Sequence, residues 1–200
     1  MSITVIVAAT LTNGIGHSGS LPWRLPAEMA YFAKATSNAP DGAINALVLG
    51  RKTWESIPRK FRPLKNRVNV IVSRQAEYNL GMPPSDLVYT QPSLGSALES
   101  LKIRQQQPAG PQLQLHRTFL IGGASLYEES LKSKSSAIDR VLLTRILSPA
   151  YEECDVFFPA LDVQWRRAPH SDLEAWVGFP VTEGVQEERG TTYEYQMWVR

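Results

Sequence analysis

Predominantly apolar runs, often rich in β-branched residues, recur along the chain and predict buried β-strands. The four clearest runs are residues 3–9, 46–49, 68–72 and 118–121. Runs without polar alternation are typical of strands that are covered on both faces. Three strands of this kind lead through a small or polar turn into a helical segment. This alternation favours an α/β fold built on a mostly parallel sheet with crossover helices.

The weaker patterns complete this prediction. Helices are expected from Pro26, from Arg51 to a stop at Pro58, and over residues 93–101 and 124–131. Further strands are expected at residues 88–90, 139–146 and 191–199. The last of these alternates between apolar and polar positions, which is typical of an antiparallel strand. We therefore predict a central, mostly parallel β-sheet with an antiparallel C-terminal strand and flanking helices.

Two stretches break the pattern. Residues 102–117 contain three consecutive glutamines, two prolines and a glycine, and we expect an exposed insertion there. It is not a domain linker, because the strand that follows continues the same pattern. Residues 168–190 are expected to be irregular. Residues 1–200 are thus predicted to form a single domain.

Composition narrows the class of protein. Of the 200 residues, 43% are hydrophobic and 20% are charged, which is enough for a substantial core. The net charge of +2 argues against a dedicated nucleic-acid binder. The first apolar run has no basic leader, and no run approaches the ~18 apolar residues of a membrane span. The single cysteine, Cys154, excludes an intrachain disulfide and favours a reducing compartment, so we expect a cytoplasmic protein.

One carboxylate lies among apolar and aromatic residues. Pro26 suits the first position of a helix, which places Glu28, Met29 and Phe32 on one helix face. Glu28 is then either a solvated first-turn acid that steadies the helix dipole or an acid held in an apolar pocket. In the second case its pKa is raised and it requires a dedicated hydrogen-bond partner.

Turns at the strand ends carry the remaining candidate chemistry. Gly50-Arg51-Lys52-Thr53 and Ser73-Arg74 are each either a phosphate-binding turn or a solvated basic turn. Gly122-Gly123 follows a strand and either makes a tight turn or lets a ligand approach the main chain. Arg67 is a candidate carboxylate clamp or a surface residue. The three histidines have no metal-ligand spacing, and no metal is predicted.

These pieces, in this order, resemble dihydrofolate reductases, and the fungal and animal forms best. The resemblance covers nearly the whole chain. The matching motifs are Val7-Ala8-Ala9, Asn13-Gly14-Ile15-Gly16, Leu21-Pro22-Trp23, Glu28 to Phe32, Gly50-Arg51-Lys52-Thr53-Trp54, Ser56-Ile57-Pro58, Arg62-Pro63-Leu64-Lys65-Asn66-Arg67, Ser73-Arg74, Ile121-Gly122-Gly123, Tyr127, Thr144-Arg145 and Asp155-Val156-Phe157-Phe158-Pro159. Each motif alone is weak, but the ordered set is specific and favours the functional interpretation of Glu28, Arg67 and the glycine pair.

The resemblance implies catalytic roles for Glu28, its hydroxyl partner Thr144, and Trp23, which would hold an ordered water. Arg67 would bind the glutamate α-carboxylate of the substrate. The implied substrate-binding residues are Ile6, Val7, Ala8, Glu28, Met29, Phe32, Ile57, Leu64, Arg67, Ile121, Tyr127 and Thr144. Met29 stands where animal forms carry Phe and bacterial forms Leu, which leaves a more deformable wall.

The resemblance also implies NADPH as cofactor. The implied cofactor-binding residues are Ala8, Ile15, Gly16, Gly19, Ser20, Leu21, Gly50, Arg51, Lys52, Thr53, Val72, Ser73, Arg74, Ile121, Gly122, Gly123, Ala124, Ser125, Leu126 and Tyr127. Gly122-Gly123 resembles the family's cis-linked pair beside the nicotinamide, and residues 13–21 resemble its mobile loop. Pro92 stands where animal forms often supply a further basic residue to the 2′-phosphate, so the preference for NADPH would rest on Arg51, Ser73 and Arg74.

The implied function is reduction of 7,8-dihydrofolate to 5,6,7,8-tetrahydrofolate, with hydride transfer to C6 and protonation of N5. This reaction feeds one-carbon metabolism and the synthesis of thymidylate and purines. Expected partners are dihydrofolate and antifolate inhibitors, with no nucleic acid or membrane, and we expect a monomer. Two alternatives are a pyrimidine reductase of riboflavin synthesis, which shares the architecture, and a non-catalytic nucleotide-binding protein. The context of Leu21-Pro22-Trp23 and Glu28 favours folate.

Overall fold

A computed structural model describes residues 2–106, 113–132 and 138–200. The strands are β1 (Ile3–Thr10), β2 (Gly14–Gly16), β3 (Ala43–Gly50), β4 (Arg67–Val72), β5 (Val88–Gln91), β6 (Gln114–Leu120), β7 (Ile138–Ser148), β8 (Val156–Phe157), β9 (Arg166–Arg167), β10 (Gln186–Glu188) and β11 (Thr191–Val199). The helices are α1 (Pro26–Ser37), α2 (Arg51–Ser56), α3 (Leu94–Gln106), α4 (Ala124–Lys132) and α5 (His170–Val177), with a 3-10 turn η1 (Arg59–Phe61).

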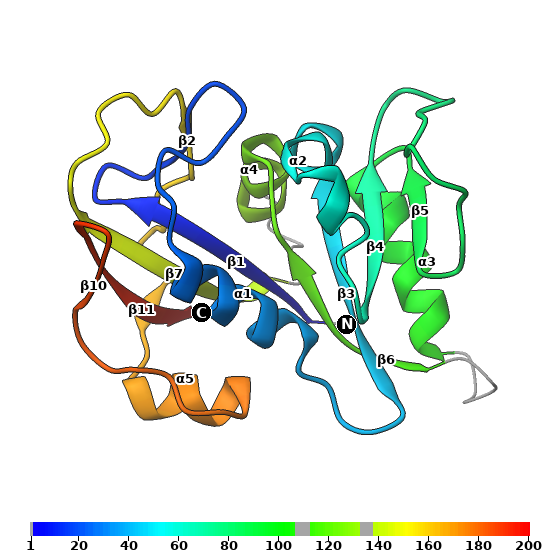
Figure 1. Ribbon diagram of the computed structural model, residues 1–200. Coiled ribbons are helices and arrows are strands. Elements are labelled where there is room, and N and C mark those ends of the chain that lie inside the picture. The colour runs from blue at the N-terminus through cyan, green and yellow to red at the C-terminus, as the bar shows by residue number, and fades with distance from the viewer. Residues whose placement is uncertain (1, 107–112, 133–137) are drawn as a thin grey trace.

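One nine-stranded sheet runs through the molecule (Figure 1). Its order is β10-β11-β7-β1-β6-β3-β4-β5, with β9 paired to β11. The six strands from β7 to β5 are parallel to their neighbours, whereas β11 runs antiparallel to β7. The predicted α/β fold with a mostly parallel sheet and an antiparallel C-terminal strand is confirmed.

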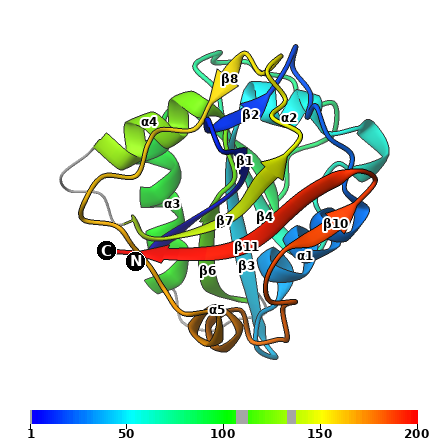
Figure 2. The same cartoon turned by 90° about the vertical axis from the view of Figure 1, so that its left-hand side faces the viewer.

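The sheet separates two apolar cores, because successive side chains of a strand point to opposite faces. One core contains Ile6, Leu49 and Ile71 of the sheet and is covered by α1 and α5. The other contains Val5, Val48 and Val70 and is covered by α3 and α4. Figure 2, in which the sheet is seen closer to edge-on, shows α1 and α4 on opposite sides of it.

Two predictions about irregular segments are wrong in part. The expected insertion over residues 102–117 is helical up to Gln106 and is β-strand from Gln114, and its centre, 107–112, lies outside the described residues. The expected irregular stretch 168–190 contains α5, whose Leu173 and Val177 lie four residues apart and are both buried in the core. The loop after β1 also contains β2, which pairs with β8.

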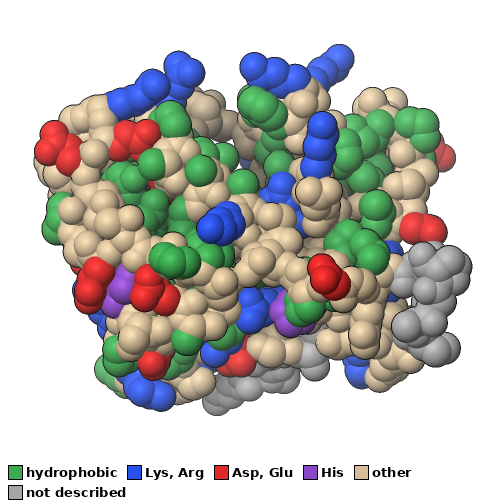
Figure 3. All heavy atoms as spheres, turned by 60° about the horizontal axis from the view of Figure 1, so that its bottom comes forward, with side chains coloured by type: hydrophobic (Ala, Val, Ile, Leu, Met, Phe, Trp, Pro, Cys, Tyr) green, Lys and Arg blue, Asp and Glu red, His purple; other side chains and the backbone are tan. Residues whose placement is uncertain are grey.

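On the face shown in Figure 3, basic and acidic side chains are interspersed, and neither kind covers the whole face. This distribution agrees with the net charge of +2. No helix in the described ranges is long and apolar enough to cross a membrane.

Candidate active site

The register of three strands brings the predicted catalytic region together. Ala8 of β1 pairs with Thr144 of β7, and Thr144 pairs with Tyr195 of β11. The three residues form a row across the sheet beneath the first turn of α1. There the Thr144 hydroxyl donates a hydrogen bond to Oε1 of Glu28 at 3.1 Å. Pro26 at the start of α1 favours this first turn, because its ring fixes the backbone φ angle near the helical value.

Glu28 is a buried acid, with 6% of its surface exposed. The pKa of its carboxyl is raised to about 7, mainly by burial; the hydrogen bond from Thr144 opposes this shift, and the charge of Glu188 adds to it. Of the two interpretations of Glu28, the structure therefore agrees with the acid held among apolar residues. Near neutral pH it can both hold and release a proton.

Trp23 lies in the same apolar core, with its ring edge-on to Tyr151 at 5.3 Å between centroids. Its indole Nε1 is buried and has no hydrogen-bond partner among the described residues. A buried N–H of this kind is a donor that a bound water can satisfy.

Most of the predicted substrate wall lies on the α1 face of the sheet. Ile6 belongs to the core on that face, and Ala8, Phe32, Ile57, Leu64 and Ile121 pack against it. Met29 extends from the same helix and is 47% exposed. Val7 and Tyr127 differ from this group, because their side chains lie in the opposite core. The Tyr127 hydroxyl donates to the Ile6 carbonyl at 2.9 Å, so Tyr127 holds the main chain of β1.

Arg67 is buried rather than a surface residue. Its Nη1 donates to the Thr36 hydroxyl at 2.7 Å, and its Nε donates to the Lys65 carbonyl at 2.9 Å. Burial lowers the pKa of Arg67 to about 10, which still leaves it charged at neutral pH. Asn69 holds the segment before it, because its side chain exchanges hydrogen bonds with the main chain of Leu64 at 3.0 and 2.9 Å.

The glycine pair joins the ends of two strands. The Gly122-Gly123 peptide bond is cis, and Gly122 has a φ of 113°. The Gly50 N–H donates to the Gly122 carbonyl at 2.7 Å, which ties the end of β3 to the end of β6. A Cβ on Gly123 would lie 3.2 Å from Oγ1 of Thr53. The absence of a side chain at Gly123 thus lets Thr53 pack closely against the main chain where α2 and α4 begin.

The other predicted cofactor residues lie in α2 and α4, which begin beside the glycine pair, or at the end of β4. Ala124, Ser125 and the buried Leu126 form the first turn of α4. Arg51 is already paired with Glu55, with both oxygens 3.0 Å from Nη1, whereas Lys52 and Arg74 are exposed. Ser73 is buried at the end of β4, and its hydroxyl accepts from the Gln75 N–H at 3.2 Å. Val72 packs against the α3 side.

The predicted mobile loop, residues 13–21, includes β2 with Ile15 and Gly16 and continues as a tight turn. His17 and Ser20 exchange main-chain hydrogen bonds of 2.9 Å around Ser18 and Gly19. Asp155 accepts from the Ser18 N–H at 3.0 Å and so joins the turn to the segment before β8. Leu21, just beyond the turn, is 49% exposed.

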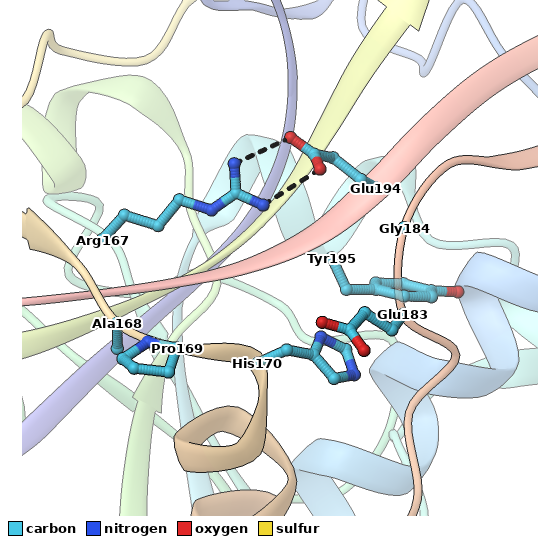
Figure 4. A pocket seen from close by; sticks show the side chains of 8 residues that line it. All are labelled: Arg167, Ala168, Pro169, His170, Glu183, Gly184, Glu194 and Tyr195. Carbon is cyan, nitrogen blue, oxygen red and sulfur yellow. Dashed lines mark hydrogen bonds and ion pairs between the residues drawn. The ribbon is translucent and has the colours of Figure 1, made fainter.

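A separate cavity of about 450 Å³ lies outside this region, and its lining includes Arg167, His170, Glu183, Glu194 and Tyr195 (Figure 4). The Arg167 guanidinium and the Glu194 carboxylate form two hydrogen bonds of 3.1 and 3.0 Å at its wall. No residue predicted to act in catalysis lines it. Tyr195 connects this cavity to the Glu28 region, because its ring packs on the ring of Tyr31 in α1, with 4.2 Å between the ring centroids.

Comparison with known proteins identifies the family. The family described as dihydrofolate reductase matches residues 2–176. The chain is 41% identical to the dihydrofolate reductase of Pneumocystis carinii, over 100% of this chain and 97% of that one. The chain belongs to the dihydrofolate reductase family. It is also 41% identical to the dihydrofolate reductase of Cryptococcus neoformans, over 99% and 94% of the two chains. Among solved structures, Schistosoma mansoni dihydrofolate reductase aligns with a TM-score of 0.78 at 33% identity, covering 100% of this chain and 98% of that chain.

The predicted resemblance to a fungal-like dihydrofolate reductase is thereby confirmed. The chain is an enzyme of this family, an oxidoreductase of tetrahydrofolate and one-carbon metabolism. The match favours dihydrofolate reductase over the pyrimidine reductase and the non-catalytic nucleotide-binding protein.

Sequence reasoning missed several residues that support the dihydrofolate reductase site. Thr36 orients Arg67, Asn69 orients Leu64, and Glu188 contacts the start of α1. Asn69 stands alone in the apolar run of β4, and a buried amide there was a detectable signal. Thr36 and Glu188 gave no such signal, because their contacts join segments far apart in the sequence.

Proposed function

We propose that this chain catalyses the NADPH-dependent reduction of 7,8-dihydrofolate to 5,6,7,8-tetrahydrofolate. The observation that carries this proposal is the buried carboxyl of Glu28, held by Thr144 at the edge of an apolar core. A flat, polar heterocycle needs a hydrogen-bond acceptor at one end and apolar contacts on its faces. Glu28 offers the first, and Ile6, Phe32 and Ile121 offer the second.

In this proposal Glu28 binds N3 and the 2-amino group of the pterin, and Thr144 fixes the direction of the carboxyl. Leu64 and Ile57 contact the aminobenzoyl ring. Arg67 binds the glutamate α-carboxylate, and the hydrogen bonds from Thr36 and Lys65 hold its guanidinium in place for that contact. The substrate is thereby oriented by two charged or ionisable groups at opposite ends.

The residues present fit NADPH. The glycine pair Gly122-Gly123 at the end of β6 presents main chain without side chains, which suits the close approach of a nicotinamide ring. Lys52, Thr53, Ser73 and Arg74 would hold phosphate groups, and Arg51 would share its guanidinium with Glu55. NADPH, when bound, supplies the hydride that is transferred to C6. The chain's contribution is to place the two rings face to face and to exclude water.

The proton for N5 takes a different route. A carboxyl at N3 cannot touch N5, so Glu28 assists through a water that the Trp23 N–H helps to hold. Because the carboxyl has a pKa of about 7, protonation of the site falls off as the pH rises above neutral. The rate of the reaction is therefore expected to fall with increasing pH.

The remaining assignments follow from the same proposal. Antifolate inhibitors would occupy the pterin region, and the exposed Met29 would influence their selectivity. We propose a cytoplasmic monomer. The lone Cys154 is not a nucleophile in this reaction, because burial and then its acidic neighbours raise the pKa of its thiol.

A spectrophotometric assay with NADPH and dihydrofolate tests the proposal directly. The nicotinamide absorbance is expected to fall only when both compounds are present. A protein that binds NADPH but leaves this absorbance unchanged on addition of dihydrofolate would contradict the proposed reaction.

A further inference from the structure

Glu188 lies at the end of β10, in a hairpin that brings it to the start of α1. It pairs with Thr191 of β11 across a two-residue turn. The turn residues Arg189 and Gly190 have φ values of 52° and 75°, the left-handed conformations of a type I′ hairpin. This tight connection fixes the position from which the Glu188 side chain extends.

The Glu188 carboxylate caps α1 from outside the helix. Both of its oxygens lie near the Ala27 N–H, at 3.2 and 3.1 Å. The residue before the helix, Leu25, makes no side-chain capping bond. A carboxylate at this place satisfies a free N–H and interacts favourably with the helix dipole. Ala27 directly precedes Glu28, so the cap acts on the turn that presents the proposed acid.

The groups that face Glu28 are mostly neutral at neutral pH. Thr144 faces it from β7, Tyr31 from α1, and Tyr193 and Tyr195 from β11. Burial raises the pKa of all three tyrosines, which keeps them uncharged. Two cations lie further along α1: Lys34 belongs to the helix and stacks over Phe179, and Arg67 bonds to Thr36. Among the described residues, Glu188 is the charged group that acts on the Glu28 carboxyl.

We propose that Glu188 is a positioning residue that fixes the first turn of α1 and, by its negative charge, disfavours ionisation of the Glu28 carboxyl. A like charge nearby disfavours ionisation, so Glu188 acts in the same direction as burial. The inference rests on the proposed function, because it assigns to Glu188 an effect on the acid of that reaction.

Three variants separate the charge of Glu188 from its capping bond. E188Q removes the charge and keeps an oxygen that can accept from Ala27. E188A removes both. E187Q is the matched control, because Glu187 is the adjacent residue of β10, is exposed, and extends to the other face of the strand.

The first measurement is the titration of Glu28 in the ligand-free protein, followed by NMR of ¹³C-labelled glutamate carboxyls and assigned with E28Q. In E188Q the titration midpoint is expected to move to lower pH, whereas in E187Q it stays at the wild-type value. E188A is expected to show the same shift together with a lower Tm. An unmoved midpoint in E188Q, or equal shifts in E188Q and E187Q, would overturn the inference.

The second measurement is the pH profile of the hydride-transfer rate. The E188Q rate is expected to equal the wild-type rate at about pH 5.5 and to be roughly twofold lower at about pH 8, because Glu28 loses its proton earlier. A uniform loss at both pH values would contradict a charge effect. If the wild-type protein does not oxidise NADPH with dihydrofolate, the proposed function fails, and the ligand-free titration still decides the coupling between Glu188 and Glu28.

Discussion

At the scale of single residues, the environment of Glu28 determines its chemistry. The same side chain in a solvated first turn would be ionised at neutral pH. Here burial and the nearby Glu188 raise its pKa to about 7, while the Thr144 hydroxyl holds one oxygen in a fixed direction. The carboxyl therefore combines a defined orientation with a proton that can be exchanged near neutral pH.

Replacement of Glu28 by Gln tests this role. The amide has nearly the same shape but carries no exchangeable acid, so Glu28→Gln is expected to remove most hydride transfer at neutral pH and to leave NADPH binding nearly unchanged. Stopped-flow rates with NADPH and dihydrofolate, together with a fluorescence titration of NADPH, measure the two effects. Full activity of the variant at about pH 7 would show that Glu28 has no part in proton delivery.

Arg67 is expected to bind the glutamate tail and not the pterin. Arg67→Leu should raise the KM for dihydrofolate strongly, by the loss of a bidentate pair, on the order of 2–4 kcal/mol. Arg67→Lys should recover only part of this loss, because a single ammonium cannot reproduce the two parallel hydrogen bonds. Steady-state kinetics at saturating NADPH measure both variants.

A small inhibitor that fills only the pterin region and has no carboxylate is the control for Arg67. Its Kd should be nearly the same in wild type and in Arg67→Leu. Comparable losses for dihydrofolate and for this inhibitor would mean that Arg67 acts structurally, through its bonds to Thr36 and Lys65.

At the scale of elements, the local pattern of the sequence predicts the longer strands of the sheet and most helices, but not the short strands β2, β8, β9 and β10. The apolar runs of β1, β3, β4 and β6 and the glycine pair after β6 are all local features. The contacts that complete the site are not local. Thr144 and Glu28 are 116 residues apart, and Ala27 and Glu188 are 161 residues apart. The resemblance to a family supplied the first contact, and nothing in the sequence supplied the second.

The segment after β4 offers a test at this scale. Ser73 is buried at the strand end, while Arg74 is exposed one residue later. Arg74 is expected to bind the 2′-phosphate, which NADH lacks, with charge-assisted bonds of about 1.5–3 kcal/mol each. Arg74→Ala should therefore weaken NADPH and leave NADH almost unchanged in parallel Kd titrations. Arg59→Ala, at an exposed cation that has no proposed cofactor contact, is the comparison for a general loss of positive charge. Equal weakening of both cofactors by Arg74→Ala would refute the assignment.

At the scale of the whole molecule, the sheet links the site to the stability of the fold. The row Ala8, Thr144 and Tyr195 crosses β1, β7 and β11. The C-terminal strand β11 therefore lies beside the strand that holds Glu28 through Thr144. Arg67, by contrast, begins β4 on the far side of β1 and bonds to the C-terminal part of α1. Helix α1 therefore connects the two ends of the proposed substrate site. Because Glu28 is buried in the first turn of this helix, ionisation of its carboxyl affects the stability of the whole fold.

The burial of Glu28 should make stability depend on pH. Its pKa rises from an ordinary value of 4.5 to about 7 on folding, so the folded state holds the proton more tightly than the unfolded chain. The resulting stabilisation is fully present below about pH 4.5 and is lost as the pH rises through about 7, on the order of 3 kcal/mol in all. Glu28→Gln cannot lose a proton, so its free energy of unfolding relative to wild type should increase between about pH 5 and pH 8. Urea denaturation at both pH values measures this difference, with the exposed Glu187→Gln as a control that should show none. A Glu28→Gln variant whose relative stability stays constant or falls over this range would show that Glu28 is ionised without cost in the folded protein.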